Sequence, residues 1–214
     1  MKKKVKLFST IASLCLAVAL MAFGVWAASS ANFGVSSKVI YTVTGQVKME
    51  YTVEVKYTEN HVDFKSDGVS AGKTEDGTET GFIKQTWKGS QNPGEAALNL
   101  VGENVIKLGE YTFNKEAVVN DVVVYTITIK NLAADKLKVK VTDNSTNGVS
   151  EGGTEIISRE HKGTTLTSEN EYECTTAGAE TATFTYVVTF KLVDASANTE
   201  INFAPTFALT AVVA

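Results

Sequence analysis

The sequence predicts an all-β protein, a two-sheet antiparallel β-sandwich of the jelly-roll or the immunoglobulin-like type. Apolar residues recur at every second position in several long stretches, and clusters of Gly, Ser, Thr, Asn and Asp separate those stretches. No stretch repeats convincingly with the period of a helix. Strict alternation gives each strand one apolar face, and two sheets of this kind bury their apolar faces against each other.

The chain opens with a pattern typical of a secretory signal peptide. Four lysines within residues 2–6 precede an uncharged apolar run over 7–26, and Ala27 supplies a small residue at the cleavage position. We expect cleavage after Ala27 by a signal peptidase. The alternative is an uncleaved anchor, because the run approaches the roughly 20 residues that span a bilayer. The expected organisation is a signal peptide (1–27), an N-terminal extension or first strand (28–37) and a single sandwich domain (38–214).

The segment that follows the predicted cleavage site has a pattern of its own. Ala31, Phe33 and Val35 alternate with small polar residues, and no charge occurs before Lys38. Such a segment is suited either to a first strand in its own sandwich or to strand donation, in which it adds to the sheet edge of a neighbouring molecule.

The clearest strand pattern covers residues 46–57, where apolar and polar residues alternate throughout. Residues 123–129 and 137–141 alternate in the same way, and the short connection 130–135 predicts that they pair as antiparallel neighbours. Further strands are expected at 184–192 and 207–213, with shorter ones at 38–44, 82–87, 111–113 and 155–158. Turn-forming clusters separate them at 66–81, 89–95, 143–154 and 194–200.

Charge excludes one large class of partners. The full chain has 20 Lys and Arg against 24 Asp and Glu, and removal of residues 1–27 leaves 16 basic residues, for a net charge of −8. An acidic surface repels phosphate backbones, so nucleic-acid binding is not expected. It favours a soluble protein outside the cell, which contacts the membrane only transiently through its signal peptide.

The sequence carries no recognisable catalytic apparatus, and no enzymatic activity or cofactor is expected. It lacks His-Glu-x-x-His and Gly-x-Ser-x-Gly motifs, and its two histidines, His61 and His161, lie a hundred residues apart in polar stretches read as solvated loops. Cys174 is the only cysteine left after signal removal, which excludes an internal disulfide and favours a buried, inert thiol.

Two features suggest weaker binding sites. Asp143, Ser145 and Asn147 place oxygen atoms at alternate positions before a glycine, and Glu151 offers another, which resembles a calcium loop without its closing glutamate; an ordinary turn is the alternative. Trp87 is the only tryptophan outside the signal peptide, and it either stacks on a sugar as an exposed platform or packs in the core.

Two strand phrases and the leader carry a resemblance. The Lys-rich leader with its Ala-rich junction, the phrase NDVVVYTITIKN over 120–131 and the phrase YVVTFKL over 186–192 resemble small secreted Firmicutes proteins of the TasA and camelysin type. The resemblance implies a signal peptide of the kind processed by a dedicated peptidase, a jelly-roll-like sandwich, and assembly into extracellular biofilm fibres by donation of an N-terminal strand.

Together these features predict a non-enzymatic, secreted structural protein. We expect an extracellular matrix or fibre subunit, or a cell-surface accessory, whose partner is a second copy of itself. The alternative is an extracellular module that binds a glycan or surface polymer through Trp87 and the polar loops.

Overall fold

The computed structural model describes residues 37–43, 46–66, 73–93, 105–145, 153–195, 201–203 and 205–214. The predicted signal peptide and the donor-strand residues Ala31, Phe33 and Val35 lie outside these ranges. Within them, no helix has the length and apolar character needed to cross a membrane.

The described residues are almost entirely strand, as the alternation predicted. The elements are β1 (Ser37–Val43), β2 (Met49–Thr58), β3 (Val62–Lys65), β4 (Lys73–Glu79), β5 (Phe82–Gln91), β6 (Val105–Phe113), β7 (Val122–Asn131), β8 (Leu137–Asp143), β9 (Thr154–His161), β10 (Thr164–Thr165), β11 (Glu169–Cys174), a 3-10 turn η1 (Glu180–Ala182), β12 (Thr183–Leu192), β13 (Ile201–Phe203) and β14 (Thr206–Val213).

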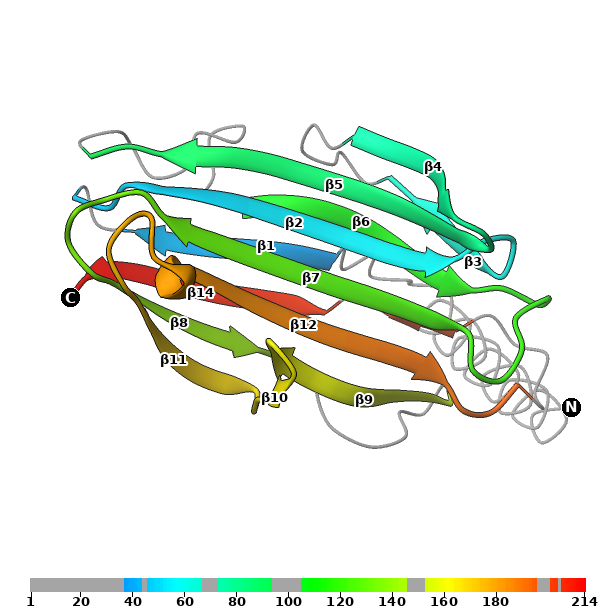
Figure 1. Ribbon diagram of the computed structural model, residues 1–214. Helices are drawn as coiled ribbons and strands as arrows, with labels where there is room; N and C mark the ends of the chain where they lie inside the picture. The colour runs from blue at the N-terminus through cyan, green and yellow to red at the C-terminus, as the bar shows by residue number, and fades with distance from the viewer. Residues whose placement is uncertain are drawn as a thin grey trace, which may run out of the picture. The chain divides into compact units, whose positions relative to one another are not determined.

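These strands form two sheets that pack face to face, which confirms the predicted two-layer, sandwich-like architecture. Sheet one has the order β11-β8-β14-β1-β6-β13, with β3 also paired to β6. Sheet two has the order β10-β9-β12-β7-β2-β5-β4 and lies in front of sheet one in Figure 1. Among the described pairings only β1 with β14 is parallel; the others are antiparallel.

The predicted pairing of residues 123–129 with residues 137–141 is wrong. β7 pairs with β2 and β12 in sheet two, whereas β8 pairs with β14 and β11 in sheet one. The connection therefore crosses from one sheet to the other. Alternation shows which face of a strand is apolar, but it does not show which strand lies beside it.

A buried asparagine holds this crossing in place. Asn131 is 1% exposed at the end of β7. Its Nδ2 donates to the carbonyl oxygens of Asp135 and Thr175, at 2.7 and 2.9 Å, and its Oδ1 accepts from the N–H of Ala133 at 2.9 Å. The Asn131 side chain thus makes hydrogen bonds to backbone groups of two loops. Such bonds are needed because a buried polar side chain has lost its hydrogen bonds to water.

The core lies between the sheets and is rich in aromatic rings. Tyr125 of β7 contacts Phe207 of β14 at 5.3 Å between ring centroids, and Tyr41 of β1 contacts Tyr51 of β2 at 5.2 Å. Both contacts join sheet one to sheet two, and all four side chains are at most 3% exposed. Tilted and edge-on ring pairs at this separation stabilise a core beyond the area that they bury.

Candidate functional site

The residue at the head of the predicted calcium loop belongs to a buried ion pair. Asp143, the last residue of β8, accepts hydrogen bonds from Arg159 of β9: Nε lies 2.9 Å from Oδ2 and Nη2 lies 3.1 Å from Oδ1. The hydroxyl of Tyr186, on β12, donates to the same Oδ2. The Arg159 and Asp143 side chains are 4% and 0% exposed, so the pair is shielded from water.

This arrangement does not support calcium binding through Asp143. Both carboxylate oxygens are already bonded to Arg159, and Oδ1 also accepts the N–H of Ser145 at 2.9 Å. A calcium ion would have to take oxygens that a guanidinium cation now holds. The other two predicted ligands, Asn147 and Glu151, lie outside the described residues. Within the described ranges, no group of three His, Cys, Asp or Glu side chains is arranged to hold a metal ion.

Burial and hydrogen bonding set the protonation states in this cluster. The hydrogen bonds that Arg159 donates to Asp143 are the main cause that raises the pKa of Arg159, so the guanidinium stays charged. Burial raises the pKa of Tyr186, so its hydroxyl stays protonated and donates to the carboxylate. The Tyr186 hydroxyl also lies 3.1 Å from the carbonyl oxygen of Thr167, in the connection from β10 to β11, so its one proton has two acceptors within reach. The cluster therefore joins β8 of sheet one to β9 and β12 of sheet two.

Trp87 lies in the core instead of on the surface. It is 4% exposed and belongs to the hydrophobic cluster between the sheets, on the same face of β5 as the buried Gln85. An indole with this burial offers no open face for stacking on a sugar ring. Of the two alternatives for Trp87, packing in the core is the one observed, so Trp87 does not support a glycan-binding platform.

The two histidines have different surroundings, and one of them corrects the loop interpretation. His61 does lie in the turn between β2 and β3, where Nδ1 is 2.8 Å from Oδ2 of Asp121. His161, by contrast, is the last residue of β9, is 7% exposed, and contacts the rings of Tyr172 and Phe184 at 4.5 and 5.1 Å. The sequence around His161 hid the end of the strand because the two inward-facing residues there, Arg159 and His161, are themselves polar.

Cys174 is a buried free thiol, as the sequence favoured. It ends β11 and is 0% exposed, and burial is the main cause that raises the pKa of its thiol to about 11. Because the thiolate is the reactive form, this side chain has little nucleophilic character at neutral pH.

The first described strand leaves little room for an N-terminal continuation in its own sheet. β1 is an inner strand between β14 and β6, and Ser37 lies opposite Gly109 of β6. Beyond that point β13 takes the edge of β6, with Phe203 opposite Tyr111, and Pro205 accepts the N–H of Lys38 at 3.2 Å. Strand β1 therefore cannot extend backward along β6.

The start of β1 is anchored to the opposite sheet. Ser37 is 0% exposed, and its Oγ lies 2.9 Å from the hydroxyl of Tyr125 on β7. Burial is the main cause that raises the pKa of Tyr125, so that hydroxyl remains a protonated donor or acceptor for the serine. The position of Ser37 is fixed by this hydrogen bond as well as by its strand neighbours.

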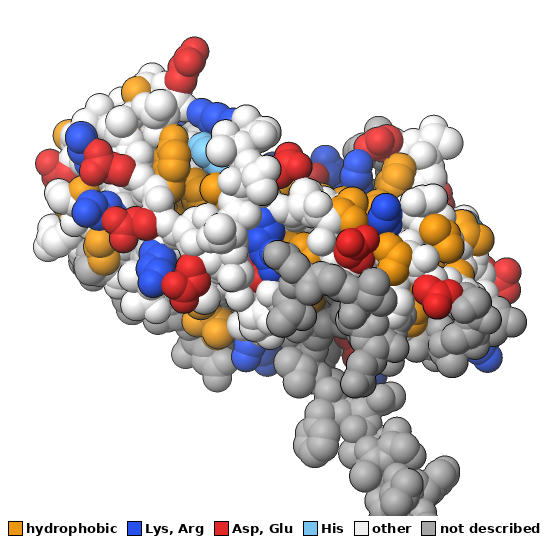
Figure 2. Space-filling view, turned by 90° about the horizontal axis from the view of Figure 1, so that it is seen from below, with side chains coloured by type: hydrophobic (Ala, Val, Ile, Leu, Met, Phe, Trp, Pro, Cys, Tyr) orange, Lys and Arg blue, Asp and Glu red, His pale blue; other side chains and the backbone are white. Residues whose placement is uncertain are grey.

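Strand β11 and the charge ladder that it forms were not among the elements predicted from the sequence. Glu169, Glu171 and Glu173 of this edge strand form ion pairs with lysines of β8, and the N–O distances of the pairs Lys140–Glu169, Lys138–Glu171 and Lys136–Glu173 are 3.9, 3.7 and 2.7 Å. Figure 2, viewed from below, likewise shows acidic and basic side chains interspersed. Charged residues along an edge discourage unspecific pairing with other chains. The alternation of Glu with Asn170 and Tyr172 was the signal that could have revealed this strand.

In comparisons with known proteins, no family model and no curated protein matches the chain.

Proposed function

We propose that the protein is a secreted, non-enzymatic structural protein, a matrix or fibre subunit or a cell-surface accessory, that assembles by donating the segment before Ser37 to a second copy. In this proposal the leader is a cleaved signal peptide, and the mature chain is a jelly-roll or immunoglobulin-like sandwich. The resemblance to secreted proteins of the TasA and camelysin type supports the same role.

The observation that carries the proposal is the position of β13. It occupies the edge of β6 directly in line with β1, from Tyr111 to Phe113. The segment before Ser37 keeps the alternation of a strand in Ala31, Phe33 and Val35, yet this edge of its own sheet is already paired. Such a segment is suited to pair with a sheet edge of another molecule, where backbone hydrogen bonds supply affinity and alternate side chains supply specificity.

Charge and composition support export. The proposed mature chain has a net charge of −8, and its only cysteine, Cys174, is buried and free. One cysteine cannot form a disulfide within the chain, so the core of the sandwich must stabilise the exported domain.

Electron microscopy and size-exclusion chromatography of the exported protein test the proposal. We expect concentration-dependent assembly, lost in a chain that lacks residues 28–36 and in the variant Phe33→Asp. Ser30→Asp, which adds the same charge to one of the alternating polar positions of the same segment, is the matched control and should assemble normally. A strict monomer at all concentrations, unchanged by the deletion, would remove the assembly claim. Mass determination of the exported chain tests cleavage after Ala27.

A further inference from the structure

The outer face of sheet two carries an uncharged patch made only of β-branched residues. β7 and β12 contribute four residues each, and β2 contributes one. All nine are of intermediate exposure, and all have the short side chains of Thr or Val. We call this set the Thr/Val patch: Thr52, Val122, Val124, Thr126, Thr128, Thr183, Thr185, Val187 and Thr189.

The strand register aligns these residues in rows across the sheet. Thr52, Thr128 and Thr185 are direct neighbours in one row, and Thr126 and Val187 are neighbours in the next. Figure 1 shows β2, β7 and β12 side by side at the front of the molecule. The patch is therefore a continuous surface over three adjacent strands, from the first residue of β7, Val122, to the first residue of β12, Thr183.

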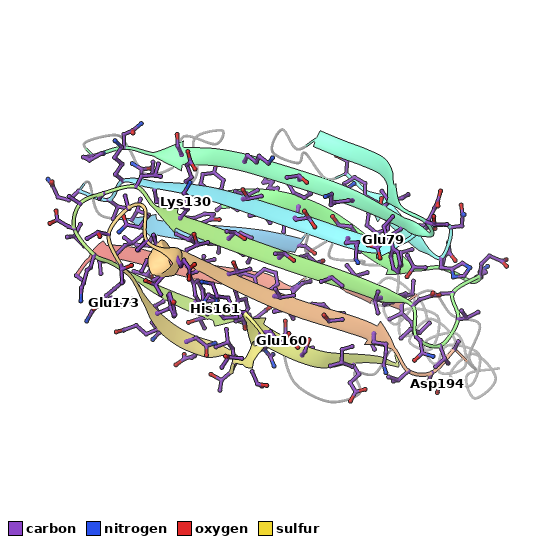
Figure 3. All side chains as sticks on the ribbon, viewed as in Figure 1. Glu79, Lys130, Glu160, His161, Glu173 and Asp194 are labelled. Carbon is purple, nitrogen blue, oxygen red and sulfur yellow. The ribbon has the colours of Figure 1, made fainter. Side chains whose placement is uncertain are left out.

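Charged residues border the patch in the same rows. Glu54 of β2 lies directly beside Thr126, and Lys130 lies directly beside Thr183. On β2, Glu50 and Lys56 lie three rows apart, with Thr52 and Glu54 between them. Figure 3 labels Lys130 and Glu79 near opposite ends of the same face. The core of a protein interface is depleted of charged residues and its rim is polar, so a charge-free centre with a charged border resembles the organisation of an interface.

We propose that the Thr/Val patch binds the same patch on a second copy of the chain, related by a two-fold axis that crosses the strands between the Thr126 row and the Thr128 row. In a two-fold interface the same surface must be complementary to itself. With the axis at this height, Thr126 faces Thr128 of the second copy and Val187 faces its Thr185, so uncharged side chains of β7 and β12 meet next to the axis. On the β2 side, Glu54 faces Thr52 of the second copy, and in the second rows Lys130 faces its Val124.

The charges of β2 fit this arrangement. Rotation about that axis brings Glu50, in the second row on one side, opposite Lys56, in the second row on the other side. The symmetry creates this opposite-charge contact twice. Both residues keep their contacts within the chain, Lys56 with Glu79 at 3.0 Å and Glu50 with Lys130 at 3.8 Å. Opposite charges that meet at the rim of an interface fix its orientation.

The available area suffices for a specific dimer. The three strands that carry the patch offer a face about 14 Å wide and about 30 Å long, from standard strand spacing and rise, so two patches bury about 800 Å². With β5 and β9, whose outward residues include Lys88 beside Thr52 and Glu160 beside Val187, the face is about 24 Å wide. Two faces of that width bury about 1,400 Å², which lies within the range of standard protein interfaces. This contact uses a different surface from the segment before Ser37, so it does not depend on strand donation.

Sedimentation equilibrium of the full chain tests the proposal. We expect a dimer whose dissociation constant rises at least about tenfold in Thr126→Lys and in Thr185→Lys, because each places a charge in an uncharged contact. Thr210→Lys is the matched control, since Thr210 is exposed on β14 of sheet one; it should leave the constant unchanged.

Charge reversal tests the orientation. Lys56→Glu alone and Glu50→Lys alone should each weaken the dimer, and the double variant should restore it to within about threefold. Glu79→Gln removes the partner of Lys56 within the chain and should have no effect on the dimer. The same measurements in a chain lacking residues 28–36 separate this contact from strand donation. Failure of the double variant to restore the dimer, equal association of all variants, or a monomer at every concentration would overturn the proposal.

Discussion

Asp143 of β8 and Arg159 of β9 form a two-pronged ion pair that joins the two sheets beneath the β10–β11 crossing. The residues are 16 positions apart along the chain but lie on edge-side strands of different layers. Asp143 was one of the oxygen ligands predicted for a calcium loop. In the structure its carboxylate instead binds Arg159 and so connects the two sheets.

Asp143→Asn should destabilise the fold strongly. It leaves the Arg159 guanidinium buried without a counter-charge, and removal of one partner from a buried pair costs about 3–5 kcal/mol. Urea denaturation measures the change. The double variant Asp143→Leu with Arg159→Met removes both charges, and its free energy of unfolding should fall less than that of a variant that lacks only one of the two charges. If Asp143→Asn unfolds at the wild-type urea concentration, the pair has no stabilising role.

Stability should fall in mildly acidic solution because of His161. Burial is the main cause that lowers the pKa of His161 in the folded state below its ordinary value, while Nδ1 lies 3.0 Å from both N and O of Thr185. The unfolded chain therefore binds a proton more readily. The contribution of neutral His161 to the stability of the fold is complete above the pKa of histidine in the unfolded chain, about 6.5. It is lost as the pH falls from there toward the lower pKa of the folded state.

Thermal unfolding across this pH window measures the effect. In His161→Phe the slope of stability against pH between about 5 and 7 should decrease, because the titrating group is gone. His61→Gln is the control for the other histidine, which lies in a partly exposed turn beside Asp121. An unchanged slope in His161→Phe would show that other groups cause the dependence.

Cys174 should react slowly with thiol reagents in the folded protein. Its pKa of about 11 and its complete burial both limit the thiolate that a reagent can reach at pH 8. Labelling by a chromogenic disulfide should accelerate greatly in denaturant, which exposes the thiol. Labelling of the native protein at the rate of the denatured chain would contradict the burial of this residue.

Gly89→Ala should destabilise the core next to Tyr51. A β-carbon on Gly89 would lie 2.3 Å from Cζ and 2.1 Å from the hydroxyl oxygen of Tyr51, on the adjacent strand. The ring is 3% exposed and packs against Tyr41, so it has little room to move. Overpacking of this kind costs about 1–3 kcal/mol. Ser90→Ala, at the exposed neighbouring position, should cost far less, and equal effects of the two changes would contradict the close approach.

The long strands could be predicted from sequence because alternation is a local property. β2, β7 and β12 each bury every second residue, as their patterns indicated, and β14 does so from Phe207 to Ala211 but leaves Val213 exposed. The strands β3 and β4 could not be predicted in this way. β3 and β4 lie in or beside a segment rich in turn-forming residues, and they exist because β6 and β5 offer them edges.

The neighbour relations and the polar contacts are not local. The separation of β7 from β8 depends on Asn131, whose partners lie in two loops, and the role of Asp143 depends on Arg159 and Tyr186, which the alternation places only on strands. Trp87 is similar: its pattern allowed either the core or the surface, and packing between the sheets decides for the core.

Peptide complementation tests the central claim most directly. A labelled synthetic peptide of residues 28–36 is titrated into the chain that lacks those residues, and binding is followed by fluorescence anisotropy. We expect saturable binding that a peptide with Phe33→Ser does not show, because the alternate apolar side chains supply the specificity. The claim is contradicted if the peptide does not bind while the shortened chain still assembles as the full protein does.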